Sequence, residues 1–357
     1  MARGVRRSTG PLDSRAQAIL RAVIDEYITS ASPIGSHTLI DRYGLGVSSA
    51  TVRAILSELE GAGLLMHPHT SAGRVPTDAG YRFYVESLVS EVPLPAIEQL
   101  MIRHQFGQVE FASDQWFRLA AATLASSTQT AGLATPAKPR AARIRRFELV
   151  GIGDRMATLI VALNEGSLKQ ALLSLDTGTT EDDLEEAARR LNASCTNRTA
   201  PDVAERLLWF GEAPADDPAW RLVRRAGERA LRILREFDAA TVESLFSDGL
   251  LNVMAAPEFG SSEKVRAVFA ALENRQHLGE LFDAVTRAGS LRIFIGKENA
   301  PPEMADVALI LAPYGQPGAA VGVVGVLGPK RMRYPQAIGT VRFVSRLMND
   351  LVDHLYV

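Results

Sequence analysis

The chain has 357 residues, 46% of them hydrophobic and 22% charged, a composition typical of a globular protein with two or three domains. Its 39 basic and 41 acidic side chains give a net charge of −2, which excludes a histone-like, globally basic nucleic-acid binder. A single cysteine, Cys195, excludes an internal disulfide framework, and since no apolar run approaches the roughly 20 residues that span a bilayer, we expect a cytoplasmic protein without a membrane anchor.

The first 13 residues carry Arg3, Arg6 and Arg7 against one acid, and we expect a flexible basic tail there. Two interpretations of this tail are open, an inert end or an arm that touches phosphate. A helix is predicted from Ser14, its expected cap, because apolar residues follow at helical spacing. A second helix is predicted from Ser36, which is its expected cap.

Residues 48–61 predict a third helix with Ser48 and Ser49 as cap candidates and a buried stripe at 52, 55, 56 and 59. Residues 64–68 and 74–76 are strand candidates around a turn-rich tip, and Thr77 is expected to cap a further helix. The segment 92–95 (VPLP) is a rigid break, at which we place a domain boundary.

Beyond the break the pattern is α+β. Residues 96–130, 180–240 and 242–288 are predicted helical, as is a last helix over 336–355. Strands are predicted in two groups of three: 144–151, 157–163 and 168–175, then 291–296, 307–314 and 319–327.

Three short helices followed by a hairpin predict a winged helix-turn-helix, a DNA-binding fold whose third helix enters the major groove. Ser49, Arg53 and Ser57 lie on one face of that helix, opposite its buried stripe. Small hydroxyl side chains permit a close approach to DNA, and arginine binds guanine edges or phosphate. The candidate DNA-contacting residues are Ser48, Ser49, Thr51, Arg53, Ser57, His67, His69, Thr70, Ser71 and Arg74.

A purely structural interpretation of the same residues stays open. The two serines then only cap the helix, and Arg53 only pairs with Asp41 or Glu60. Residues 1–80 carry eight arginines and seven acids, so a net charge of +1 predicts modest non-specific attraction to DNA.

Several short motifs resemble the family of the heat-inducible transcription repressor HrcA. In the N-terminal part they are 33–36 (PIGS), 48–53 (SSATVR), 59–60 (LE), 63–64 (GL) and 69–77 (HTSAGRVPT). Further along they are 249–252 (GLLN), 257–259 (PEF), 295–299 (IGKEN) and 328–334 (GPKRMRY). The resemblance covers nearly the whole chain and leaves the N-terminal arginine tail unexplained.

This resemblance implies a repressor of chaperone operons that binds an inverted-repeat operator, CIRCE, as a homodimer, with the chaperonin GroEL keeping it active. It implies a winged-helix domain at 14–92, a GAF-like α+β domain at 96–175 and 246–357, and a dimerising insert at 176–245. The strands at 144–175 are the open point, because they fit either the GAF-like sheet or the insert. A GAF-type sensor of a small molecule is the alternative function.

Other motifs predict no chemistry. Glycines at 322–328 alternate with valines as in a packed strand, and a phosphate loop would need a helix directly after them. His67 and His69 have no third metal ligand nearby, and Cys195 has no His–Asp partner. We expect no catalytic residues, metal or cofactor, and a structural or interface role for the basic cluster of Lys330, Arg331 and Arg333.

Overall fold

The protein is mixed α+β, and its residues fall into two compact units. The computed structural model describes residues 12–44, 46–69, 73–90, 92–109, 114–139, 141–164, 166–214, 217–239, 244–299, 302–316 and 320–356. The first unit draws on 1–136, 244–314 and 322–351, and the second on 137–243, 315–321 and 352–357. No helix among the described residues is long and apolar enough to cross a membrane.

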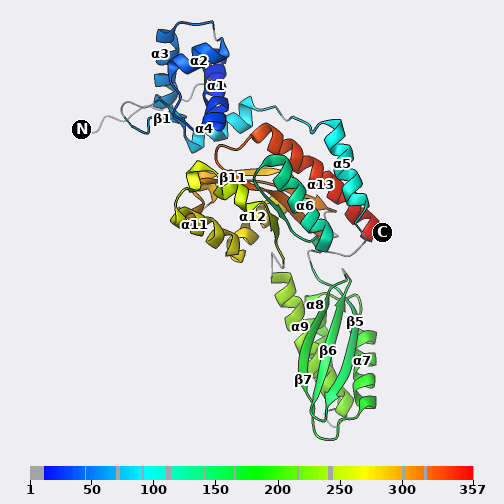
Figure 1. The fold of residues 1–357 in the computed structure, drawn as a ribbon. Helices are drawn as coiled ribbons and strands as arrows, with labels where there is room; N and C mark the ends of the chain where they lie inside the picture. The colour runs from blue at the N-terminus through cyan, green and yellow to red at the C-terminus, as the bar shows by residue number, and fades with distance from the viewer. Residues whose placement is uncertain are drawn as a thin grey trace, which may run out of the picture. The chain divides into compact units, whose positions relative to one another are not determined.

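Three helices, a short hairpin and a fourth helix open the first unit (Figure 1). Their bounds are α1 (Ser14–Ser30), α2 (Ser36–Tyr43), α3 (Ser49–Gly61), β1 (Leu65–Met66), β2 (Val75–Pro76), α4 (Asp78–Phe83) and the π-helical turn η1 (Tyr84–Leu88). The helices bury the apolar stripes expected from their spacing, including Leu20, Leu39 and Leu56.

The helix caps differ from the sequence prediction at two of four positions. Ser48 and Thr77 cap α3 and α4 as predicted, each accepting a backbone N–H. Ser14 does not cap α1, because Asp13 accepts from the Ala16 N–H at 2.6 Å. An aspartate is as good a cap as a serine, and its charge also suits a helix N-terminus. Gly35 precedes α2 without a side-chain cap, so the prediction for Ser36 is also wrong.

The hairpin is fixed to the connection between α1 and α2. Ile34 and Arg74 exchange two backbone hydrogen bonds, both 2.9 Å long. Gly73 makes this approach possible, since a Cβ there would lie 2.5 Å from the Ile34 carbonyl carbon. The chain before α2 therefore lies against the start of β2.

A second part of the first unit is built on a sheet with strand order β8-β3-β11-β10-β9. The strands are β3 (Ala131–Ala134), β8 (Phe246–Asp248), β9 (Arg292–Ile295), β10 (Val307–Gly315) and β11 (Ala320–Pro329). In the second unit, β4 (Lys138–Pro139) pairs with residues 320–321 at the start of β11. The predicted strands at 291–296, 307–314 and 319–327 are confirmed as β9, β10 and β11. β8 lies in a segment predicted to be helical, and that prediction is wrong for these three residues.

Helices accompany this sheet, and Figure 1 shows α6 beside α13. They are α5 (Ala96–Gly107), α6 (Asp114–Thr128), α10 (Leu250–Met254), α11 (Ser262–Glu273), α12 (Arg275–Ala288) and α13 (Tyr334–Tyr356), with 3-10 turns η2 (Pro257–Phe259), η3 (Gly296–Asn299) and η4 (Pro302–Met304). Gly132 lets α6 pack closely on β3, because a Cβ there would lie 2.0 Å from the Ala121 carbonyl oxygen.

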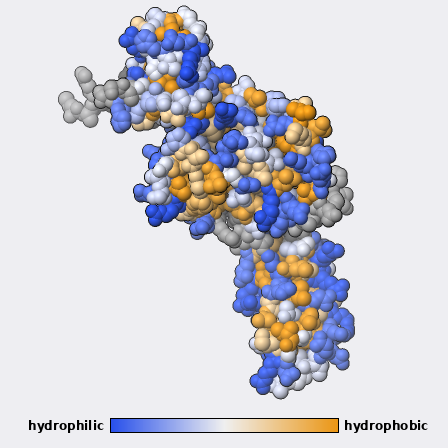
Figure 2. Space-filling model, viewed as in Figure 1, coloured by the Kyte–Doolittle hydropathy of each residue, from blue (hydrophilic) through white to orange (hydrophobic). Residues whose placement is uncertain are grey.

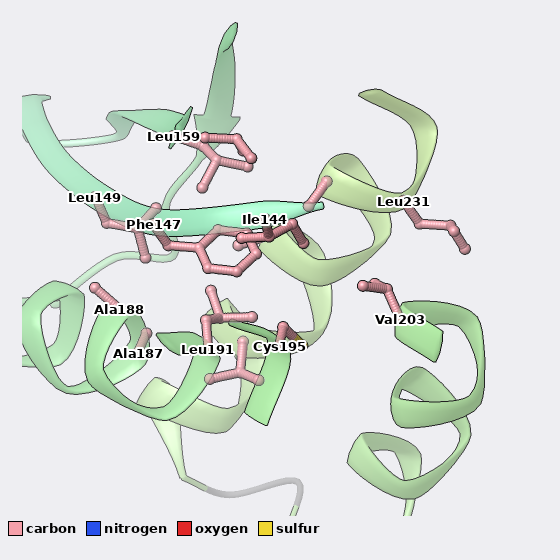
Figure 3. Packing of buried hydrophobic residues seen from close by; sticks show 14 of the residues in the cluster. Ile144, Phe147, Leu149, Leu159, Ala187, Ala188, Leu191, Cys195, Val203 and Leu231 are labelled. Atoms are coloured by element: carbon pink, nitrogen blue, oxygen red, sulfur yellow. The ribbon is translucent and has the colours of Figure 1, made fainter. Parts of the chain in front are cut away.

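The second unit contains a separate antiparallel sheet, β5-β6-β7, with three helices. The bounds are β5 (Ile144–Gly153), β6 (Met156–Leu163), β7 (Leu168–Ser174), α7 (Glu181–Cys195), α8 (Ala200–Gly211) and α9 (Pro218–Ala239). Ile144, Phe147 and Leu149 of β5 point at Ala187 and Leu191 of α7 in one buried cluster (Figure 3). The strands that the sequence left unassigned thus pack with the helices that follow them.

Candidate nucleic-acid interface

The exposed side of α3 carries small residues and one arginine. Ala50, Arg53, Ala54 and Ser57 are all exposed, whereas Val52, Leu56 and Leu59 on the other side are buried. Helical spacing therefore separates a core stripe from a face on which Arg53 stands among the small side chains of Ala50, Ala54 and Ser57. Such a face can approach another surface closely along its whole length.

The N-terminus of α3 is held in place by hydroxyl groups. Ser48 Oγ accepts from the Thr51 N–H at 3.2 Å and lies 3.0 Å from Thr51 Oγ1. Ser49 Oγ lies 3.4 Å from Ser36 Oγ, which joins the starts of α2 and α3. The capped N-terminus presents partial positive charge, which favours phosphate. Ser48, Ser49 and Thr51 thus order this end of the helix, whatever else they contact.

Arg53 extends from the exposed face of α3 without an acidic partner in the described part of the chain. Its Nε donates to the Ser49 carbonyl oxygen at 3.3 Å within the same helix. The pairing with Asp41 or Glu60 that the sequence left open does not occur in these residues, and Glu60 binds His67 and Arg74 instead. The terminal guanidinium nitrogens of Arg53 remain available for a ligand.

Glu60 connects α3 to the hairpin. His67 Nδ1 donates to Glu60 Oε1 at 2.6 Å, and Arg74 Nη2 donates to Glu60 Oε2 at 3.2 Å. The His67 hydrogen bond, with Arg74 adding to its effect, holds the pKa of the Glu60 carboxyl below its usual value. Arg74 also donates to Ser57 Oγ at 3.3 Å, so its side chain is only 16% exposed. Both hairpin residues therefore fix the hairpin against α3.

The remaining candidates divide by exposure. His69 is exposed near the tip of the hairpin, while Thr70 and Ser71 lie outside the described residues. The structure brings Arg53, Ser57 and Arg74 together on one side of α3, with Ser48, Ser49 and Thr51 at its start. Ala50 and Ala54 were not among the sequence candidates, although their spacing of four residues around Arg53 signals the same exposed face.

Residues considered for other chemistry have structural surroundings. Cys195 is fully buried, and burial raises the pKa of its thiol to about 11, which opposes thiolate formation. Among the described residues, no group of three or more His, Cys, Asp or Glu side chains is arranged to hold a metal. Lys330 and Arg331 are bound in ion pairs with Asp78 and Glu258. Arg333 lines a cavity of about 460 Å³ together with residues of α1 and 92–95.

Comparisons with known proteins identify the family. The family described as "HrcA protein C terminal domain" matches residues 114–338. The heat-inducible transcription repressor HrcA of Herpetosiphon aurantiacus is 41% identical over 345 residues, which are 97% of this chain and 96% of that protein. Its counterpart in Roseiflexus castenholzii is 40% identical over 350 residues, which are 98% and 96% of the two chains.

A solved structure described only as a hypothetical protein shares the fold, with a TM-score of 0.59, 21% identity and coverage of 96% of this chain and 99% of that one. The repressor relatives match the chain over nearly its full length, including the helices and hairpin described above. The protein is therefore a member of the HrcA family of heat-inducible transcription repressors and not an enzyme.

Proposed function

We propose that this protein represses chaperone operons by binding an inverted-repeat operator of the CIRCE type as a homodimer. The exposed face of α3, with Arg53 among Ala50, Ala54 and Ser57, supports this proposal. Beside it lies a hairpin that Glu60 holds in place. In this proposal residues 14–92 are a winged helix-turn-helix, and α3 is its recognition helix. Ser49, Thr51 and Arg53 read or position bases, and His69, Thr70, Ser71 and Arg74 lie along the adjacent backbone or minor groove.

The structure suggests a larger inserted domain than the sequence alone. A GAF-like domain is assigned to the larger sheet and its helices, and an inserted dimerising domain to the second unit. The strands β5, β6 and β7 go with the insert, because their buried faces pack on α7, α8 and α9. The proposed insert therefore covers about 137–243 and not only 176–245.

The open face of the β5-β6-β7 sheet supports dimerisation through this insert. Leu168, Leu172 and Ile152 are 65%, 59% and 56% exposed on that face, and Val150 and Met156 are exposed beside them. Figure 2 shows hydrophobic residues over these strands. Since a monomer rarely exposes so many large apolar side chains on one sheet, a second copy of the chain is the proposed cover.

Release of the operator on heating is proposed to follow from loss of the active fold. A protein of marginal stability loses its folded population several-fold for each ~1–2 kcal/mol of destabilisation. The chaperonin GroEL is the proposed partner that restores this fold, so that chaperonin occupied by other unfolded proteins leaves the repressor inactive.

The sensor alternative receives no support from the interior of the larger sheet. β10 and β11 are buried along nearly their whole length, and a Cβ at Gly325 would lie 2.2 Å from the Ile310 carbonyl oxygen. The cavity of about 460 Å³ lies elsewhere, between α1, the 92–95 segment and the start of α13. A polar-lined cavity inside the sheet domain is what a sensing site would require.

A mobility-shift titration tests the proposed function. The purified full chain is added to an inverted repeat from upstream of a chaperone operon and to a scrambled copy of the same composition. The proposal predicts preferential binding of the repeat, loss of binding after a heat pulse, and recovery that is faster with chaperonin and ATP. Equal affinity for both DNAs, or recovery that chaperonin does not change, would contradict the corresponding part of the proposal.

A further inference from the structure

The helix that follows the hairpin places a carboxylate in a socket made by distant parts of the chain. Asp78, the first residue of α4, receives Lys330 Nζ at 2.8 Å on one oxygen and the Lys297 backbone N–H at 3.2 Å on the other. Gly296 has a positive φ of 56°, and a Cβ there would lie 2.4 Å from Asp78 Oδ2. The socket therefore requires glycine at 296, both for its backbone conformation and for space.

One helical turn later, Arg82 binds the same distant segment. Its Nε donates to Glu298 Oε1 at 2.9 Å, and its Nη2 donates to the other carboxylate oxygen and to the Ile293 carbonyl oxygen. Glu298 is held ready for this contact, because it also accepts from the Ile295 N–H at 2.9 Å. Such a two-pronged arginine–carboxylate pair fixes orientation as well as distance.

Aromatic packing fills the space between these polar contacts. Tyr334, at the start of α13, is fully buried, and its ring centroid lies 6.0 Å from that of Tyr81 and 6.3 Å from that of Tyr84. Arg331 beside it donates to the Ile28 carbonyl oxygen of α1 and to Glu258. Two segments, 293–298 and 330–334, thus bind α4 and the end of α1, and together with α4 we call them the α4 clamp.

The clamp is directly connected to α3 and the hairpin, the elements proposed to contact DNA, which we call the DNA-reading region. Thr77 Oγ1 donates to the Gly63 carbonyl oxygen at 2.7 Å and caps α4, which joins the end of α3 to the start of α4. A Cβ at Gly80 would lie 2.1 Å from the Leu64 carbonyl oxygen, so α4 also packs directly on the chain before β1. Whatever orients α4 therefore orients α3 and the hairpin.

We infer that the α4 clamp sets the orientation of the DNA-reading region relative to the larger sheet, and that Asp78, Arg82 and Glu298 are positioning residues for operator recognition. This inference rests on the proposed function. In a dimer, two reading regions bind two half-sites at once only if their separation and direction match the operator. If the clamp is loosened, each DNA-reading region stays intact, but the two copies no longer bind both half-sites at the same time.

Charge reversal across the clamp tests this inference. Arg82→Glu in the full-length protein places two carboxylates against each other, and we expect its affinity for the full inverted repeat to fall about tenfold or more. Affinity for a DNA with a single half-site stays within about threefold, because the reading face is untouched. The double variant Arg82→Glu, Glu298→Arg recovers most of the loss. Arg287→Glu on α12, the same charge change outside the clamp, has no effect on either DNA.

A milder variant guards against loss of folding. Asp78→Asn keeps the size of the side chain and removes the charge that Lys330 binds, so it should show the same split between full and half operator at smaller magnitude. Equal losses on the full and half operators, or a double variant no better than Arg82→Glu, would overturn the inference.

The clamp is also measurable without DNA, which separates this inference from the proposed function. Spin labels at Ser32→Cys and Glu303→Cys report the distance between the N-terminal helices and the larger sheet region, while buried Cys195 stays unlabelled. We expect a narrow distance distribution, a broad one after Arg82→Glu, and a narrow one again in the charge-swapped double variant. A distribution that Arg82→Glu leaves narrow contradicts the clamp even if the protein binds its operator as proposed.

Discussion

Among the described residues near α3, Arg53 has a guanidinium group that no side chain binds. The nearby Arg74 of the hairpin, by contrast, is held by Glu60 and Ser57. We predict that Arg53→Ala weakens operator binding by ~1–3 kcal/mol more than it weakens binding to random DNA, if its guanidinium reads a base. Arg287→Ala is the matched control, since Arg287 makes the same bond to the carbonyl four residues earlier on α12. Mobility-shift titrations on both DNAs measure this, and equal losses would make Arg53 a phosphate anchor.

Glu60 makes the attachment of the hairpin sensitive to acid. Its pKa is lowered in the folded protein by the hydrogen bond from His67, so its stabilising contribution is present above the usual glutamate pKa and is lost as pH falls through the lowered value. We therefore expect the difference in melting temperature between the wild type and Glu60→Gln to be largest near neutral pH and to vanish in acid.

Glu58→Gln, two residues away on the exposed side of α3, is the control for this titration. At neutral pH it should not lower the melting temperature, because the Glu58 side chain is exposed. A Glu60→Gln difference that persists unchanged at acid pH would mean that the carboxylate charge does not hold the hairpin.

For single residues, the sequence predicts local roles such as helix caps better than it predicts long-range hydrogen-bond partners. Ser48 and Thr77 were recognised as caps because the cap lies within three residues of the N–H it binds. The sequence predicts that Arg74 contacts DNA but does not predict its bonds to Glu60 and Ser57, which lie 14 and 17 residues earlier on α3. Only the folded hairpin brings those groups together, so no local pattern could predict the pairing.

A cysteine at the end of α7 can report when the second unit unfolds. Cys195, its last residue, is buried in the cluster beneath β5 and has a thiol pKa of about 11 (Figure 3). We predict that a thiol reagent at pH 8 labels the native protein slowly, and that labelling accelerates at the temperature where this unit unfolds, because only the exposed thiolate reacts.

An exposed neighbour provides the comparison. Thr196→Cys in a Cys195→Ser background should label quickly at all temperatures, since residue 196 lies on the surface. If Cys195 reacts as fast as this variant in the cold, the packing of α7 on β5 is not as tight as described.

Beyond residue 95, the sequence predicts the long, strongly patterned strands but not the short strands β3 and β8. The six strands predicted beyond residue 95 are all present, because each alternates or concentrates β-branched and apolar residues. β3 contains only alanine, glycine and leucine, and β8 only three residues, so neither carries a periodic signal. Which strands share a sheet is also beyond local patterns, since the paired residues of β3 and β11 lie at least 190 positions apart in the chain.

On the scale of the molecule, charge limits how DNA can be bound. Residues 1–80 carry a net charge of +1, and Arg42, Arg74 and Arg82 are bound to carboxylates. Each phosphate contact adds about −0.9 to the slope of log affinity against log salt, so we expect a slope of magnitude below about 6 for a dimer. Titrations between low and physiological salt measure it.

A steeper slope would point to the arginines of the N-terminal tail. Deleting residues 1–11, which include Arg3, Arg6 and Arg7, distinguishes the two interpretations of that tail. An unchanged slope after the deletion makes the tail inert, and a reduced slope makes it an arm on the phosphates.

Two copies of one reading region should bind two half-sites in a fixed arrangement, so affinity should depend strongly on the spacing between the half-sites. In a mobility shift on the chaperone-operon repeat, inserting about five base pairs between the half-sites turns one of them to the opposite face of the DNA. We expect affinity then to fall to that of a single half-site. Affinity that is indifferent to the insertion would contradict it.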